Sequence, residues 1–204
     1  MTSHRVLEDW PLWYLPDALD GTRAWQVFEE LLALPLWEQP DITLFGKRHP
    51  IPRQQIWMGD PDAAYRYSNQ QFIPVAWHPT VASLRDGMIQ LARQLLPDAP
   101  AFNSVLLNHY ENGQHRMGWH SDNEPELGSK PVIASLSLGA TRDFRLRRAD
   151  PACRTLTPSF NIPLEHGSVL LMGPGVQTDW QHSLPPRQRH QSPRINLTFR
   201  HVFR

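Results

Sequence analysis

The spacing of hydrophobic and polar positions divides the chain into a helical first part and a strand-rich second part. After an irregular opening, Trp25, Phe28, Leu31 and Leu32 recur at helical spacing, so residues 1–40 contain one predicted amphipathic helix. Residues 20–22 supply cap and turn chemistry before it, and a proline at position 35 ends it. A second helix is predicted from Thr80 to Leu96, closed by the next proline. Its apolar face consists of Val81, Leu84, Met88, Leu91 and Leu95.

Strands and turns are expected elsewhere. Turns and alternating aromatic residues from Ile56 to Phe72 suggest hairpins. From residue 103 onward, glycine and proline separate short apolar runs. The predicted strands are Ser104–Tyr110, Val132–Leu138, Phe144–Arg147, Ser168–Met172 and Arg194–Val202. This order predicts a mainly β (α+β) fold, a β-sandwich or jelly roll backed by helices. Residues 1–100 and 101–204 are expected to share one core in one domain.

Composition narrows the class of protein. The 204 residues suit one domain, and 40% hydrophobic residues can form a sizeable core. No run approaches the roughly 20 apolar residues of a membrane span, and the N-terminus lacks the layout of a secretory signal. Cys153 is the single cysteine, so an internal disulfide is excluded and a reducing compartment is expected, cytosolic or, in a eukaryote, nuclear.

The charges balance, but the basic residues are unevenly placed. Twenty basic residues match twenty acidic ones, which argues against a protein that grips polyanions over its whole surface. Three basic clusters remain, and the ordinary interpretation of each cluster by itself is a solvated face. They are Lys47, Arg48, His49 and Arg53; Arg142, Arg145, Arg147 and Arg148; and Arg187, Arg189 and His190.

A His-x-Asp sequence offers the first candidate for metal chemistry. In an extended chain, residues two apart share a face, so His120 and Asp122 can reach one point. Together they supply two members of the facial triad that holds non-haem iron and leaves three positions open. The pair alone also fits a surface turn. The third ligand is expected downstream among His166, His182, His190 and His201, and His182, after a Gly-Pro-Gly loop, is the best candidate.

The last strand carries an unusual polar face. Alternation places Arg194, Asn196, Thr198 and Arg200 on one side, while the residues between them are apolar. Arginine holds carboxylates bidentately, and long side chains from positions roughly 20 Å apart can converge on a small dicarboxylate. An amphipathic edge strand with exposed arginines is the competing interpretation. Asn108 and Tyr110 form a second polar pair on one face of an apolar strand.

Together these segments resemble the AlkB family of iron(II)/2-oxoglutarate dioxygenases, which repair alkylated DNA and RNA bases. The matching runs are 108–113, 119–124, 133–144, 166–168, 181–185 and 194–200, in the expected order within residues 42–204. The resemblance implies a double-stranded β-helix (jelly roll) with a nucleotide-recognition hairpin lid. It also implies Fe(II) held by His120, Asp122 and His182, with 2-oxoglutarate and O2 as co-substrates.

The resemblance also assigns the polar residues. Arg194, with Asn108 and Tyr110, would hold the far carboxylate of 2-oxoglutarate, while Asn196 and Arg200 would support its chelating end. The implied reaction hydroxylates an N-linked alkyl carbon, as in 1-methyladenine or 3-methylcytosine, which then leaves as an aldehyde. Glu124 would orient or stabilise the cationic base, although a solvated carboxylate is the alternative.

Segments in the first half of the chain indicate how nucleic acid would be bound. Residues 41–47 and 52–55 resemble the family member that prefers double strands, in which an apolar wedge fills the stack that a flipped base vacates. Phe45 is the expected wedge, with Lys47, Arg48 and Arg53 on phosphates. Tyr65 and Tyr67 would stack on the flipped base or serve the core.

Strand preference and substrate remain open at this level. Residues 119–128 look more like the member that prefers single strands, so we expect alkylated DNA with duplex tolerated. RNA, a protein or a small molecule is the alternative substrate, and a non-catalytic jelly-roll module that binds nucleic acid is the alternative class. A monomer without membrane contact is expected.

Overall fold

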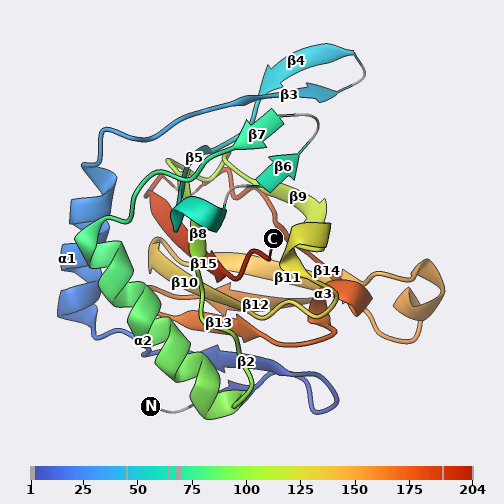
Figure 1. The fold of residues 1–204 in the computed structure, drawn as a ribbon. Helices are drawn as coiled ribbons and strands as arrows, with labels where there is room; N and C mark the ends of the chain where they lie inside the picture. The colour runs from blue at the N-terminus through green and yellow to red at the C-terminus, as the bar shows by residue number, and fades with distance from the viewer. Residues whose placement is uncertain (1–2, 45, 64, 68–69, 190, 204) are drawn as a thin grey trace.

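Two antiparallel β-sheets face each other, and two long helices cover the outer side of the larger one (Figure 1). The computed structural model describes residues 3–44, 46–63, 65–67, 70–189 and 191–203. In spatial order, the larger sheet contains β1 (His4–Arg5), β2 (Leu12–Leu15), β13 (Val169–Met172), β10 (Ile133–Gly139), β15 (Arg194–Arg200), β8 (Ser104–Tyr110) and β5 (Gln54–Gly59). The smaller sheet contains β12 (Phe160–Leu164), β11 (Arg142–Arg148), β14 (Trp180–Leu184) and β9 (Met117–His120).

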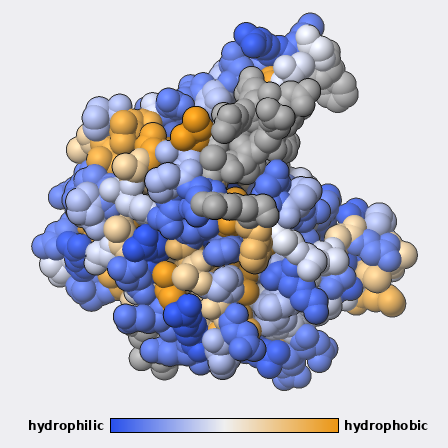
Figure 2. All heavy atoms as spheres, in the orientation of Figure 1, coloured by the Kyte–Doolittle hydropathy of each residue, from blue (hydrophilic) through white to orange (hydrophobic). Residues whose placement is uncertain are grey.

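The remaining elements lie around these sheets. Two hairpins project at the top of Figure 1: β3 (Asp41–Leu44) with β4 (Lys47–Pro50), and β6 (Tyr65–Tyr67) with β7 (Gln70–Phe72). The helices are α1 (Gly21–Leu32), α2 (Pro79–Leu95) and α3 (Val176–Asp179), with 3₁₀ turns at Pro61–Ala63, Pro125–Leu127 and Pro151–Arg154. Figure 2 shows that the projecting β3–β4 hairpin is mostly hydrophilic, in agreement with its exposed residues Lys47, Arg48 and His49. Within the described residues, no helix has the length and apolar character to cross a membrane.

Both predicted helices are confirmed. Asp20 caps α1, because its carboxylate accepts a hydrogen bond from the backbone N–H of Arg23 at 3.1 Å. The buried face of α1 differs from the predicted one, since Ala24 and Val27 are buried whereas Trp25 is 52% exposed. The small side chain of Ala24 lets the helix approach its neighbours closely, and Trp25 instead lies across His166 at 4.2 Å between ring centroids.

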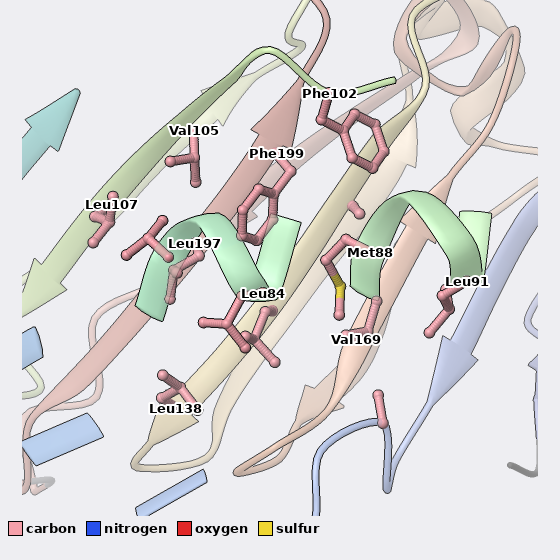
Figure 3. Packing of buried hydrophobic residues seen from close by; sticks show 14 of the residues in the cluster. Leu84, Met88, Leu91, Phe102, Val105, Leu107, Leu138, Val169, Leu197 and Phe199 are labelled. Carbon is pink, nitrogen blue, oxygen red and sulfur yellow. The ribbon is translucent and has the colours of Figure 1, made fainter. Parts of the chain in front are cut away.

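The main hydrophobic core lies between the helices and the larger sheet. Leu84, Met88 and Leu91 extend from α2 toward Leu197 and Phe199 of β15 (Figure 3). The alternate residues of β15 point the other way, between the two sheets. Strand alternation therefore makes β15 contribute to the apolar core with one face and to the inter-sheet space with the other.

A second apolar cluster joins the two sheets and leaves a polar cavity beside it. Its members include Leu12, Ile133 and Leu170 of the larger sheet and Leu146 and Trp180 of the smaller one. The strand that carries Leu12 corrects one expectation, because residues 12–15 are not irregular but pair with β13 as β2. The run Leu-Trp-Tyr-Leu has no alternation that would reveal a strand, and its partner lies more than 150 residues away.

Candidate metal centre and dicarboxylate pocket

Two histidines and an aspartate converge in a space of about 460 Å³ between the sheets. His120 ends β9 and His182 lies on β14, where strand pairing places them opposite each other. Asp122 follows two residues after His120, and one ligand atom from each of the three residues lies within 4.8 Å of the others. The structure therefore brings together the three residues that the sequence analysis names as a metal site.

The competing histidines that the structure describes lie outside this group. The ring of His166 accepts a hydrogen bond from the backbone N–H of Gly139 at 2.8 Å. The ring of His201 binds the carbonyl oxygen of Ala101 at 2.6 Å. His190 lies outside the described residues.

His120 has one ring nitrogen committed and the other directed inward. Its Nδ1 lies 2.9 Å from the carbonyl oxygen of Gly118. A carbonyl only accepts, so we assign the proton to Nδ1, which leaves the lone pair of Nε2 available to a ligand. A ligating histidine is typically oriented by such a bond through its other nitrogen.

His182 is held as a neutral ring. Burial lowers its pKa to about 3, and the neighbouring His120 acts in the same direction. The ring is 4% exposed and stacks on Phe144 at 4.9 Å between centroids. An imidazole must be neutral to bind a metal, so this environment keeps His182 in the form that can ligate.

Asp122 is buried but remains a carboxylate. Burial alone would raise its pKa, yet the positive charge of Arg200 outweighs that effect and holds the pKa below its usual value. Arg200 Nη2 lies 3.0 Å from Asp122 Oδ2, which leaves Oδ1 facing His120 Nε2 at 3.7 Å. The charge is therefore neutralised on one side and free to bind a cation on the other.

The donor set fits a metal ion. The Nε2 atoms of His120 and His182 are 3.1 Å apart. Imidazole–metal bonds of about 2.1 Å at right angles would place two ligand nitrogens about 3 Å apart. Two neutral imidazoles and one carboxylate, converging from one side, match the facial arrangement of non-haem Fe(II) sites.

The polar face of β15 lines the same cavity. All five residues predicted to contact the co-substrate, namely Asn108, Tyr110, Arg194, Asn196 and Arg200, border it together with the three metal-site residues. Strand pairing places Arg194 opposite Tyr110 and Asn196 opposite Asn108. Arg200 lies at the metal end, where it binds Asp122, and Arg194 lies six residues away along the strand. An exposed edge strand is excluded, because β15 pairs on both sides and is buried throughout.

Arg194 is a buried cation without a matching anion. It is 2% exposed, and its Nη2 donates to Ser137 Oγ at 2.9 Å. Burial lowers its pKa to about 10, so it still carries its charge at neutral pH. Among the described residues, no carboxylate forms an ion pair with it. Buried charges are ordinarily paired, so the site is suited to an anionic ligand.

The other wall of the pocket was not predicted. Ser135 and Ser137 of β10 bind the amide of Asn196 and the guanidinium of Arg194. Their alternation with Ala134, Leu136 and Leu138 was a readable signal, because two buried serines at positions i and i+2 imply one polar face.

Arg53 occupies a different place from the expected phosphate contact. Its Nε donates to Asn108 Oδ1 at 2.8 Å, and its side chain is partly buried. Position 53 directly precedes β5, which pairs with β8, and this places the guanidinium beside the cavity. Lys47, by contrast, is exposed on the β3–β4 hairpin and remains available to a phosphate.

Glu124 lies next to a second, smaller space. This space of about 220 Å³ is bordered by Glu124, Glu126, Trp57, Leu127, Arg200 and Val202. Glu124 Oε2 is shielded from solvent and has no hydrogen-bond partner among the described residues. Arg200 borders both spaces, so Glu124 lies near the metal end of the cavity.

Three further residues were predicted to contact the substrate, and the structure describes the backbone of two of them. Phe45 lies outside the described residues. Tyr65 and Tyr67 belong to the β6 backbone and pair with Phe72 and Gln70 of β7.

Known proteins resemble this chain in both sequence and fold. A family model described as the 2OG-Fe(II) oxygenase superfamily matches residues 11–200. The Bos taurus protein named alpha-ketoglutarate-dependent dioxygenase alkB homolog 3 is 37% identical over 193 residues, which covers 92% of this chain and 65% of the relative. The Homo sapiens DNA oxidative demethylase ALKBH2 is 39% identical over 166 residues, covering 79% of this chain and 60% of the relative. The chain thus spans somewhat less than two thirds of these relatives.

Solved structures confirm the fold. The structure of OsALKBH1 matches with a TM-score of 0.67 at 18% identity and covers 98% of this chain and 100% of that one. An oxidoreductase of the 2OG-Fe(II) oxygenase family from Burkholderia pseudomallei matches with a TM-score of 0.65 at 14% identity, covering 95% of this chain and 87% of that one. The predicted jelly roll with flanking helices is confirmed.

The family model and the geometry agree on the ligands of the site. Fe(II), 2-oxoglutarate and O2 are the cofactors that the superfamily and the His–Asp–His group indicate. On this sequence and structural evidence, the chain belongs to the 2OG-Fe(II) oxygenase superfamily and, within it, to the AlkB family.

Proposed function

We propose that the chain carries out oxidative dealkylation of N-alkylated bases in DNA, with 1-methyladenine and 3-methylcytosine as representative substrates. The observation that carries this proposal is a single cavity that contains both groups. The His–Asp–His group lies at one end of it, next to Arg200, and the buried Arg194, which has no carboxylate partner among the described residues, lies farther along the same face of β15. A relative of 39% identity named DNA oxidative demethylase supports the choice of substrate.

The metal site would be formed by His120, Asp122 and His182. The Nε2 atoms of the two imidazoles lie 3.1 Å apart and can both face one ion, and Asp122 presents the oxygen that Arg200 does not bind. When bound, iron would supply the oxidation chemistry, in which one atom of O2 would enter succinate, formed together with CO2 from 2-oxoglutarate, and the other would enter the alkyl carbon, which would leave as an aldehyde. The surrounding apolar residues of both sheets restrict water around the reacting groups.

The co-substrate would lie between Arg200 and Arg194. Asn108 is prepared as a donor, because Arg53 occupies its Oδ1 and leaves Nδ2 toward the cavity. Arg194, Asn108 and Tyr110 would therefore hold the far carboxylate, and Arg200 would lie beside the chelating end. Asn196 takes a supporting part in this proposal, since both hydrogens of its amide already bind Ser135 and Leu136.

Glu124 would face the alkylated base. A carboxylate oxygen shielded from solvent and without a protein partner is costly unless a donor or cation meets it in the complex. A base that carries positive charge after N-methylation, or an exocyclic amino group, supplies such a partner.

The decisive experiment is mass spectrometry of methylated oligonucleotides after incubation with the protein, Fe(II) and 2-oxoglutarate. We expect loss of the methyl mass from DNA containing 1-methyladenine or 3-methylcytosine, with matching RNA, single-stranded and duplex samples in parallel. His120→Ala and Asp122→Ala should abolish turnover in folded protein, whereas His201→Ala, at a histidine outside the cavity, should retain it. Turnover in either ligand variant would refute the metal assignment.

A non-catalytic module is distinguished by spectroscopy. Anaerobic addition of Fe(II) and 2-oxoglutarate should produce a weak visible absorption band in the wild-type protein. If no band forms and 2-oxoglutarate is not consumed, the enzyme proposal fails. If 2-oxoglutarate is consumed but no oligonucleotide is demethylated, only the substrate is wrong.

We further propose that the β3–β4 hairpin supports action on duplex DNA. It projects from the molecule and exposes Lys47 and Arg48, as a phosphate-binding element would (Figure 1). Replacement of Phe45 by Ala should reduce repair of duplex lesions far more than of single-stranded ones. Leu156→Ala, a change at an exposed apolar residue away from this hairpin, is the matched control. Equal losses on both substrates would contradict the wedge.

A further inference from the structure

A buried glutamine contacts the backbone of the proposed metal ligand Asp122. Gln177 of α3 is 2% exposed, and its Oε1 accepts a hydrogen bond from the Asp122 N–H at 2.9 Å. Its Nε2 lies 3.3 Å from Met172 Sδ. Glutamine is seldom fully buried, so a fully buried amide with both ends engaged calls for a role.

The orientation of this amide follows from its partners. A backbone N–H can only donate, so the oxygen of Gln177 must face Asp122. The thioether of Met172 is a weak acceptor, which matches the NH₂ end. Only one orientation of the amide satisfies both hydrogen bonds. In that orientation Gln177 holds the backbone of Asp122 at a fixed distance from α3.

The segment that carries Gln177 also carries the second metal ligand. The backbone of α3 continues directly into β14, on which His182 lies. Ser121 Oγ donates to the Trp180 carbonyl oxygen at 2.9 Å, so two consecutive residues, 121 and 122, are bound to the same segment. Val176 and Trp180 of this segment are buried in the inter-sheet cluster, so apolar packing anchors the segment on both sides of Gln177.

We propose that Gln177 is a positioning residue that sets the place of the Asp122 carboxylate relative to His182 and thereby tunes metal affinity. The inference rests on the proposed metal site. Gln177 does not border the cavity, so it acts through Asp122 and not on the metal or the substrate.

Metal titration tests this role without any need for turnover. Gln177→Met keeps the length and the burial of the side chain but removes the acceptor. Metal-free protein titrated with Mn(II), followed by the electron paramagnetic resonance of free Mn(II), should show about 10- to 100-fold weaker binding in this variant. Gln177→Glu retains an acceptor oxygen and should recover much of the affinity. Thr178→Ala, at the exposed neighbouring position, should bind like the wild type.

The outcomes separate positioning from a purely structural role. If Gln177→Met unfolds at a lower temperature but binds Mn(II) as the wild type does, the inference is overturned. If that variant does not fold, Gln177→Asn, which keeps an amide but is too short to reach Asp122, carries the same expectation. Failure of the wild-type protein to bind Mn(II) would instead overturn the metal site itself, and the inference with it.

Discussion

At the scale of single residues, Arg194 gives the clearest evidence for an anionic ligand. Its charge is buried, and its guanidinium donates a hydrogen bond to the neutral hydroxyl of Ser137 and lies 5.4 Å from the centre of the Tyr110 ring. A protein has little reason to bury such a cation between two sheets unless a counter-charge arrives with a ligand.

Replacing Arg194 should therefore weaken the binding of 2-oxoglutarate without weakening the binding of the metal. A hydrogen-bonded charge of this kind contributes about 1.5–3 kcal/mol, so Arg194→Met should weaken 2-oxoglutarate binding by roughly 10- to 150-fold. Isothermal titration of Mn(II)-loaded protein measures this directly. Mn(II) affinity should be unchanged, since Arg194 lies away from the metal end. A variant that binds 2-oxoglutarate normally would show that the carboxylate lies elsewhere.

His109 gives a pH prediction that is independent of the metal. Burial lowers its pKa below 6.5, and its Nδ1 lies 2.8 Å from Gln54 Oε1. As pH falls below about 6.5, the unfolded chain takes up a proton before the folded one does, so this contribution to stability is complete above that pH and is lost below it.

The matching variant is His109→Gln, which keeps a donor but does not titrate. Between pH 7.5 and 5.5, its free energy of unfolding in urea should fall less than that of the wild type. His166 and His182 have lowered pKa values as well, so some loss should remain in the variant. Identical pH profiles would show that His109 is protonated equally in both states.

At the scale of elements, Arg142 ties two loops to β11. Its guanidinium donates to the carbonyl oxygens of Asn112, His115 and Pro185, at 3.3, 3.0 and 2.8 Å. The first two lie between β8 and β9, and the third follows β14, so one side chain connects the loops next to both histidine-bearing strands.

Removal of this connection should be costly. Arg142→Met leaves three carbonyl oxygens to find other partners and should lower the free energy of unfolding by about 2–4 kcal/mol. Arg145→Met, on the same strand but partly exposed, should cost less than about 1 kcal/mol. Urea denaturation of the two variants at one pH provides the comparison. Equal losses of stability would show that Arg142 does not hold the two loops together.

The elements also differ in how readily the sequence reveals them. The strand from 104 to 110 and the second long helix were predicted within one residue of their observed ends, and the first long helix was placed between its cap at Asp20 and Pro35, because their apolar periodicity is strong. β9, β12 and β14 were not identified as strands. They are short and mix polar with apolar residues, and β12 contains Pro163, so local periodicity is weak.

At the scale of the whole molecule, two hydrophobic clusters have separate tasks. The larger cluster joins the helices to the seven-stranded sheet, whereas the smaller one joins the two sheets beside the metal site. A change in the first should act on stability alone, and a change in the second should reach the site.

This division can be tested with a pair of variants. Leu91→Ala, in the larger cluster, should lower the free energy of unfolding by about 2–5 kcal/mol and leave Mn(II) affinity unchanged. Phe144→Leu, in the smaller cluster, should cost less stability but weaken Mn(II) binding several-fold, because the ring stacked on His182 is lost. Thermal unfolding and metal titration of both variants distinguish the effects, and equal metal affinities would contradict the division.

The sequence by itself determined the faces of the structure and the chemistry they carry. Strand alternation put Arg194, Asn196 and Arg200 on one side of the last strand and so predicted a site for a dicarboxylate. The His-x-Asp motif put His120 and Asp122 on one face and so predicted two metal ligands. These predictions succeeded because a strand's two faces follow from its local geometry alone.

Only the tertiary structure decided which distant groups meet. It brought His182 next to His120 and Asp122, directed Arg53 to Asn108 rather than to the expected phosphate contact, and placed Gln177 against the backbone of Asp122. These contacts join residues that are 55 or more positions apart. They depend on how sheets pair and pack, which no local pattern of hydrophobic and polar residues specifies.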